Sequence, residues 1–82
     1  MVEIILDPLF ESKIRKIKDS FLKTRIEKQM DKIIADPEIG KPMRYARKGT
    51  REVYLGSFRL SYAYLQGENK LIFLDLYHKD EQ

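Results

Sequence analysis

The feature that most constrains how this chain can fold is a change in hydrophobic spacing at residues 36–42, which read DPEIGKP. Before this segment, apolar residues recur every three or four positions, as they do on one face of a helix. From about Met43 onward they alternate with polar residues, as they do in β-strands. The proline and glycine residues of the segment itself are typical of a connecting loop. A chain of 82 residues divided in this way is expected to form one domain, residues 1–82, in which helices pack against a sheet.

The first half begins with a short β-branched run at residues 2–6, which predicts a strand. Asp7 and Pro8 then have the residue types of a helix N-cap and a first helical position. Two stripes with helical spacing follow: Leu9, Phe10, Ile14, Ile17 and Phe21, and then Leu22, Ile26, Met30, Ile33 and Ile34. No glycine or proline separates the stripes, so one bent helix and a helical hairpin are both compatible with the pattern, and we favour the hairpin.

In the second half, turn signals at residues 56–57 and 66–69 separate three β-rich runs, at 44–55, 58–65 and 70–77. Short turns between consecutive strands predict an antiparallel meander. The predicted order is therefore β-α-α-β-β-β, an α+β fold with two N-terminal helices packed on one face of the sheet.

Alternation along the strands predicts which side chains face the helices. These are Phe58, Leu60, Tyr62 and Tyr64 in the middle run, and Ile72, Leu74 and Leu76 in the last run. The opposite, open face is then expected to carry Arg59, Ser61, Ala63, Asp75 and Tyr77, with Arg51 of the neighbouring strand as a further candidate. His78 follows the last strand, where the twist of the chain allows either side.

Composition excludes several classes of protein. No apolar run approaches the ~20 residues of a membrane span, and the N-terminus is too short and acidic for a signal peptide. There is no cysteine and only one histidine, which argues against a disulfide framework, a zinc site or any other metal centre. We therefore expect a cytoplasmic protein without a cofactor, a metal or a membrane partner.

The net charge of +3 arises entirely in the second half, since residues 1–40 carry eight basic and eight acidic side chains, and residues 41–82 carry eight and five. A window without an acidic residue contains Lys41, Arg44, Arg47, Lys48 and Arg51. Such a window is a candidate footprint for a polyanion such as RNA. The alternative is an ordinary solvated loop and edge strand.

The cations, tyrosines and imidazole near the end of the predicted sheet suit one metal-free reaction. Cleavage of RNA by its own 2′-hydroxyl needs a base, an acid and cations that stabilise the transition state. Arg59 and Lys79 are candidates to hold the phosphate, and His78 to move a proton. Tyr77 or Tyr54 is a candidate to stack on a base. The alternatives are an ion pair of Arg59 with Asp75, a solvated tail, and tyrosines that only pack the sheet.

Three segments resemble a known family. GSFRLSYAYL, which starts at Gly56, is similar to the G-x-[FY]-R-[ILV]-x-Y strand of the RelE/ParE toxin superfamily. GKPMRY, which starts at Gly40, resembles the G-K-P-L-R segment that follows the second helix of these toxins. FLDLYHKDEQ, which starts at Phe73, resembles the end of their last strand, where many members carry a histidine followed by Arg or Lys.

The resemblance covers essentially the whole chain and implies the toxin of a type II toxin–antitoxin pair, with two helices on a curved, mainly antiparallel sheet. RelE-like members cleave mRNA in the ribosomal A site without a metal. By this resemblance Arg59 matches a catalytic or phosphate-holding arginine, and His78 and Lys79, next to Tyr77, match the catalytic C-terminal end. The implied partners are a RelB-like antitoxin and ribosome-bound mRNA. The toxin is expected to be monomeric alone and to form a heterotetramer or larger assembly with its antitoxin.

Two alternatives stay open at this point. ParE-like members share the scaffold and inhibit DNA gyrase without cleaving RNA, and a non-catalytic RNA- or protein-binding module of the same fold is also compatible. Where RelE-like sequences place Lys or Arg along the strand before Arg59, this chain has Glu52 and Tyr54. His78 and Lys79 favour the ribonuclease.

Overall fold

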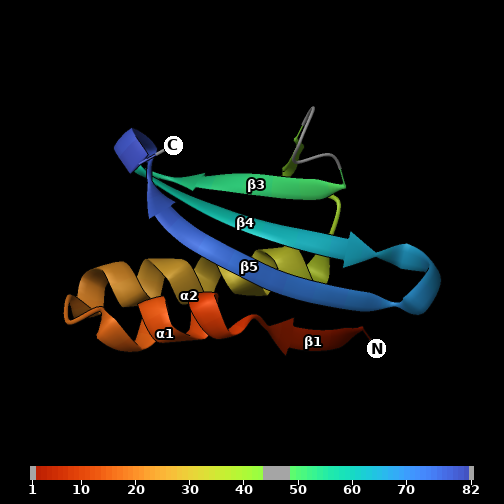
Figure 1. Ribbon diagram of the computed structural model, residues 1–82, viewed down its shortest axis with the longest axis horizontal. Helices are drawn as coiled ribbons and strands as arrows, with labels where there is room; N and C mark the ends of the chain where they lie inside the picture. The colour runs from red at the N-terminus through yellow and green to blue at the C-terminus, as the bar shows by residue number, and fades with distance from the viewer. Residues whose placement is uncertain (1, 44–48, 82) are drawn as a thin grey trace.

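Two helices lie on one face of a five-stranded sheet (Figure 1). The computed structural model describes residues 2–43 and 49–81. In chain order the elements are β1 (Glu3–Leu6), α1 (Pro8–Lys16), α2 (Ser20–Ala35), β2 (Lys41–Pro42), β3 (Thr50–Leu55), β4 (Phe58–Leu65), the 3₁₀ turn η2 (Gln66–Glu68), β5 (Lys70–His78) and the 3₁₀ turn η3 (Lys79–Glu81). This confirms the predicted α+β class and element order, to which the structure adds the short strand β2. Within the described residues, neither helix combines the length and hydrophobicity that crossing a membrane requires.

The helical hairpin is confirmed, and each helix begins at an aspartate. The Asp7 carboxylate accepts a hydrogen bond from the Leu9 N–H at 2.9 Å, and Pro8 occupies the first turn of α1. Asp19 caps α2 in the same way, accepting from the N–H groups of Phe21 and Leu22. A side chain that satisfies these otherwise unpaired N–H groups favours a helix start at that point. The second cap therefore separates two helices where the sequence has neither glycine nor proline.

The strand order in the sheet is β1-β5-β4-β3-β2. β1 runs parallel to β5, and the other neighbours are antiparallel. The meander β3-β4-β5 matches the predicted runs, except that β3 begins at Thr50 and residues 44–48 of the predicted strand lie outside the described residues. Gly56, with φ 60°, turns the chain between β3 and β4 in a conformation that residues other than glycine rarely adopt.

The predicted faces are correct for β4 and partly wrong for β5. Leu60 and Tyr62 are fully buried under the helices, as expected. In β5, however, the residues buried under the helices are Leu71, Phe73 and Leu76, not Ile72 and Leu74. The reason is a β-bulge, because Ser61 pairs with Asp75 while its neighbour Tyr62 pairs with Phe73. The additional residue, Leu74, reverses the alternation within β5.

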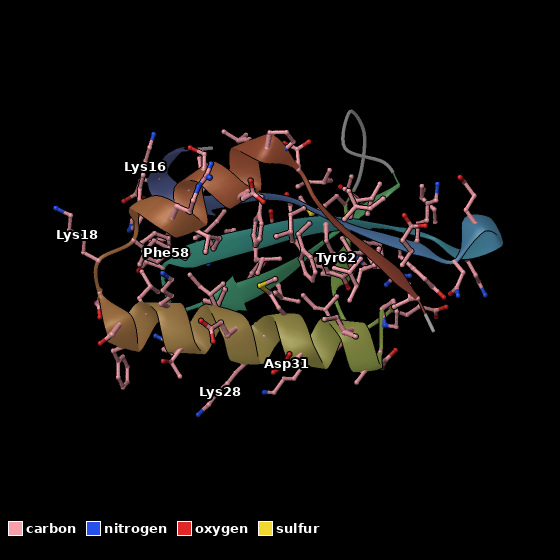
Figure 2. The ribbon with its side chains drawn as sticks, turned by 90° about the horizontal axis from the view of Figure 1, so that it is seen from below. Lys16, Lys18, Lys28, Asp31, Phe58 and Tyr62 are labelled. Carbon is pink, nitrogen blue, oxygen red and sulfur yellow. The ribbon has the colours of Figure 1, made fainter. Side chains whose placement is uncertain are left out.

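Tyr62 joins the core to the loop between α2 and β2. Figure 2, viewed from the helix side, shows it between β1 and the C-terminal part of α2. Its hydroxyl accepts a hydrogen bond from the Gly40 N–H and donates one to the Pro37 carbonyl, both at 2.8 Å. Because the ring is fully buried and both bonds end on backbone atoms, Tyr62 fixes the path of this loop.

Tyr62→Phe is expected to lower the free energy of unfolding by about 1–3 kcal/mol at neutral pH, since it leaves two backbone groups without their partner. Burial raises the pKa of the Tyr62 phenol above its usual 10.0. The unfolded chain therefore loses this proton at a lower pH than the folded one, and the contribution to stability present below pH 10 falls as the pH rises further. Urea unfolding at pH 7 and above pH 10 measures both effects. The parent protein should lose stability more steeply with alkaline pH than Tyr62→Phe, and equal slopes would contradict this account.

Candidate functional site

Three side chains form a row across the open face of the sheet, on the side away from the helices. Arg59 in β4 is paired with Tyr54 of β3 on one side and with Tyr77 of β5 on the other. Directly paired residues of antiparallel strands present their side chains on the same face. The row therefore places Arg59 between two tyrosines of the neighbouring strands.

Arg59 is held in place by the Tyr54 ring and by the chain around the β3–β4 turn. Its guanidinium carbon lies 3.9 Å from the centre of the Tyr54 ring, a cation–π contact. One guanidinium nitrogen donates to the carbonyls of Gly56 and Phe58, at 3.0 and 3.1 Å. The alternative ion pair with Asp75 is not formed, since the Asp75 carboxylate binds Lys13 of α1 at 2.7 Å. Tyr54 is about half exposed, so the row is open to solvent at this residue.

Sequence analysis did not identify Glu52 as part of this face. Its side chain is almost fully buried, and its carboxylate accepts a hydrogen bond from the Tyr77 hydroxyl. Tyr77 is also buried, although it lies on the face away from the helices. The bond runs from β3 to β5 and passes over β4, so Glu52 fixes the orientation of the Tyr77 ring. It also places a carboxylate two pairs along the strands from Arg59, because Glu52 is paired with Ser61.

The structure does not bring His78 to the face that carries Arg59. His78 is paired with Phe58, and the two rings meet edge to face at 5.4 Å between centroids. Phe58 packs against the core on the helix side, and Figure 2 shows it between the helices. The Nδ1 atom of His78 accepts a hydrogen bond from the Asp80 N–H at 3.2 Å. The catalytic role expected for His78 beside Arg59 therefore requires a rearrangement of the tail.

Lys79 follows His78 and lies at the same end of the sheet. Its backbone N–H donates to the Ser57 carbonyl at 2.8 Å, which attaches the tail to the β3–β4 turn. Its side chain is exposed. The Lys79 ammonium is thus available to solvent near the turn that precedes Arg59.

The basic window is divided by the fold. Arg51 is paired with Tyr62 on the helix side, not on the open face where it was a candidate to join Arg59. Its guanidinium donates to the carbonyls of Glu38 and Gly40, at 2.9 and 2.8 Å, and so supports the loop before β2. Lys41 is exposed on β2. The remaining members of the window, Arg44, Arg47 and Lys48, lie outside the described residues.

The site is built from cationic, phenolic and carboxylate groups alone. In the part of the chain that the structure describes, no three His, Asp or Glu side chains are grouped as a metal ion would require. A guanidinium beside an exposed aromatic ring binds a phosphate and stacks against a base, or binds an anionic and aromatic surface of a protein.

Comparison with known proteins gives one family match for the sequence. Residues 4–82 match the sequence profile described as "ParE toxin of type II toxin-antitoxin system, parDE". None of the curated proteins matches the chain.

Solved structures share the fold at low sequence identity. The toxin–antitoxin complex RelBE of E. coli contains a chain with a TM-score of 0.79 and 14% identity, over 95% of this chain and 96% of the other. A chain of the RelBE2 complex from Mycobacterium tuberculosis gives 0.78 and 20% identity, over 94% and 96%. The YoeB/ParE toxin from Agrobacterium tumefaciens gives 0.83 and 11% identity, over 94% and 98%. These likenesses confirm the two-helix, five-stranded architecture.

Proposed function

The chain belongs to the ParE toxin family of type II toxin–antitoxin systems, and we propose that it is a translation-inhibiting toxin that cleaves ribosome-bound mRNA. In this cleavage the 2′-hydroxyl loses its proton and attacks the adjacent phosphate, and the bond to the 5′-oxygen of the next nucleotide breaks. The leaving oxygen takes up a proton, and the products are a 2′,3′-cyclic phosphate and a free 5′-hydroxyl. Its partner in the resting cell is an antitoxin, as in the RelBE complexes that share the fold.

The observation that carries this proposal is the row of Tyr54, Arg59 and Tyr77 on the open face. Arg59 holds the scissile phosphate and stabilises the charge that develops on it in the transition state. Tyr54, about half exposed, stacks on a neighbouring base. Lys79 and Lys41 are exposed and contact the RNA backbone.

Controlled expression in bacteria tests the function. We expect immediate arrest of protein synthesis, together with cut messages that map to translated regions. Purified protein should cleave a message on ribosomes and leave the same message intact when ribosomes are absent. Intact mRNA during full growth arrest would overturn the nuclease proposal.

A second candidate function is inhibition of DNA gyrase without RNA cleavage. The observation that favours it is the match of residues 4–82 to the ParE toxin family, because ParE-like members inhibit gyrase. Gyrase inhibition predicts DNA-damage signalling and filamentation during growth arrest, with translation continuing at first. Expression without any effect on growth would instead indicate a non-catalytic binding module.

The part of His78 is tested separately. We expect His78→Gln to slow cleavage far less than the ~10²-fold loss that removal of a working general acid or base causes. The reason is that the imidazole packs on Phe58, on the side of the sheet away from Arg59. Single-turnover cleavage by the parent and by His78→Gln measures this. A loss of ~10²-fold would show that the tail turns when RNA binds and would place His78 among the catalytic residues.

A further inference from the structure

The two edges of the sheet differ in how well they are protected against pairing with a further strand. One edge is β2, which consists of Lys41 and Pro42. Lysine and proline are residues with which natural edge strands prevent such pairing. The other edge is β1, Glu3–Leu6, whose last three residues are large and apolar (Figure 1). The edge of β1 is therefore able to continue the sheet.

The backbone of β1 offers hydrogen bonds to a further strand at every second residue. The N–H groups of Glu3 and Asp7 each donate, at 2.9 Å, to a carbonyl on the β5 side. Successive residues of a strand turn their N–H and C=O groups to opposite sides. The backbone groups of Ile4 and Leu6 therefore point away from β5, to the side on which none of the described strands pairs with β1.

The side chains of Ile4 and Leu6 add apolar surface at the same edge. They are paired with Leu71 and Phe73 of β5, which are buried under the helices, so they lie on the helix side of the sheet. Ile4 and Leu6 nevertheless remain 43% and 38% exposed. The core of the domain thus reaches the solvent at β1, and a strand added there would cover this apolar surface.

We infer that a second copy of this chain pairs with β1 in the antiparallel direction, about a two-fold axis at Ile4. Backbone bonds form when outward-pointing residues face each other, so Ile4 pairs with Ile4 of the second copy. Val2 and Leu6 pair with each other on both sides of the axis, so every side chain in these pairs is apolar. The inference goes beyond the proposed function and replaces the monomer that the family resemblance implied.

The backbone allows a two-fold axis at Glu3, Ile4 or Ile5, and charge selects among them. An axis at Glu3 places its carboxylate opposite its own copy, and an axis at Ile5 places it opposite Asp7. Like charges directly opposite each other destabilise a strand pair. With the axis at Ile4, Glu3 faces the apolar Ile5 and keeps Lys70, its partner in β5, beside it. This register alone avoids a pair of facing carboxylates.

The dimer leaves the row of Tyr54, Arg59 and Tyr77 open. Paired residues lie on the same face, so the helices of both copies lie on one face of the continued sheet and both rows on the other. The pairing strand has only four residues, so the contact buries less than the ~1,200 Å² of a stable complex. We therefore expect dimers at about millimolar protein and monomers at about micromolar protein.

Single cysteines test the pairing, since the chain has none of its own. Paired residues that exchange backbone bonds lie about 5.5 Å apart at Cα, within the range of a disulfide, so Ile4→Cys should form a covalent dimer on oxidation. Leu6→Cys is the matched control, because it has similar exposure on the same edge but its copies would lie about 14 Å apart. We expect cross-linking to be at least about tenfold faster at position 4.

A charge at position 4 gives a second test, which does not depend on cross-linking. In sedimentation equilibrium, Ile4→Lys and Ile4→Glu should each be monomeric at millimolar protein, since each charge faces its own copy across the axis. An equimolar mixture of the two variants should recover the dimer. Ile39→Lys and Ile39→Glu change a residue that is 49% exposed and lies outside β1, and each should dimerise like the parent.

Three results would overturn the inference. A parent protein that stays monomeric at millimolar concentration would leave the edge of β1 to a strand of another protein. Equal cross-linking at positions 4 and 6 would show random collision, and a mixture of the two Ile4 variants that stays monomeric would exclude the axis at Ile4. None of these measurements involves RNA, so failure here is distinct from failure of the proposed function.

Discussion

Gly40→Ala is expected to lower the free energy of unfolding by about 3 kcal/mol, the largest stability loss that we predict for one methyl group in this chain. A Cβ atom at position 40 would lie 2.5 Å from the Tyr62 hydroxyl oxygen and 2.8 Å from a ring carbon. The ring is unable to withdraw, because it is fully buried and its hydroxyl is hydrogen-bonded to the same loop. The loop itself must therefore move, which breaks the bonds that Tyr62 and Arg51 make to it.

Urea unfolding of the parent protein and of Gly40→Ala measures this loss, and Gly67→Ala is the matched control. A Cβ atom at position 67 meets no atom within 4 Å, so this change should alter stability by no more than about 0.5 kcal/mol. If Gly40→Ala were as stable as Gly67→Ala, the loop would be able to move without cost, and the conclusion that Tyr62 fixes its path would be wrong as well.

Arg59→Ala is expected to reduce mRNA cleavage by ~10²-fold or more and to abolish growth inhibition. Its effect on folding should be small, about 1 kcal/mol, because the side chain lies on the open face and its main contact is the cation–π contact with Tyr54. Cleavage on ribosomes and thermal unfolding of the same preparations separate the two effects.

Two further variants make the test of Arg59 specific. Arg15→Ala removes an equally large cation from the surface of α1, where the side chain is 72% exposed, and should leave cleavage unchanged. Arg59→Lys keeps the charge but loses the planar fork that holds a phosphate through two bonds, so it should recover only part of the rate. A folded Arg59→Ala protein that remains fully toxic would remove Arg59 from the proposed site.

The elements of the fold were predictable because local chemistry decides them. Asp7 and Pro8 start the first helix whatever it packs against, and the segment at 36–42 ends the second. The face on which Arg59 lies also followed from local alternation. Leu60 and Tyr62 are alternate apolar residues of the same strand and had to be buried, so Arg59 lies on the opposite face. The two-residue turn at 56–57 pairs residue 55 with 58 and thereby places Tyr54 opposite Arg59, a pairing that had not been predicted.

The faces of β5 were not predictable in the same way. A bulge is a property of two strands together, and Leu71–Leu76 contain apolar residues at positions compatible with either register. Only the packing of Leu71, Phe73 and Leu76 under the helices selects one of them. The bulge leaves Tyr77 on the open face and places His78 against Phe58.

The sequence by itself determined the element order and the presence of an arginine on an uncovered sheet face, because hydrophobic spacing and turn residues act over a few positions. The tertiary structure decided which side chains accompany that arginine. Glu52 and Tyr77 are 25 positions apart in the chain, and their hydrogen bond exists only because β4 lies between β3 and β5. Arg51, which belongs to the same basic window as Lys41, was diverted to the loop carbonyls for the same reason, since pairing with Tyr62 turns it to the helix side.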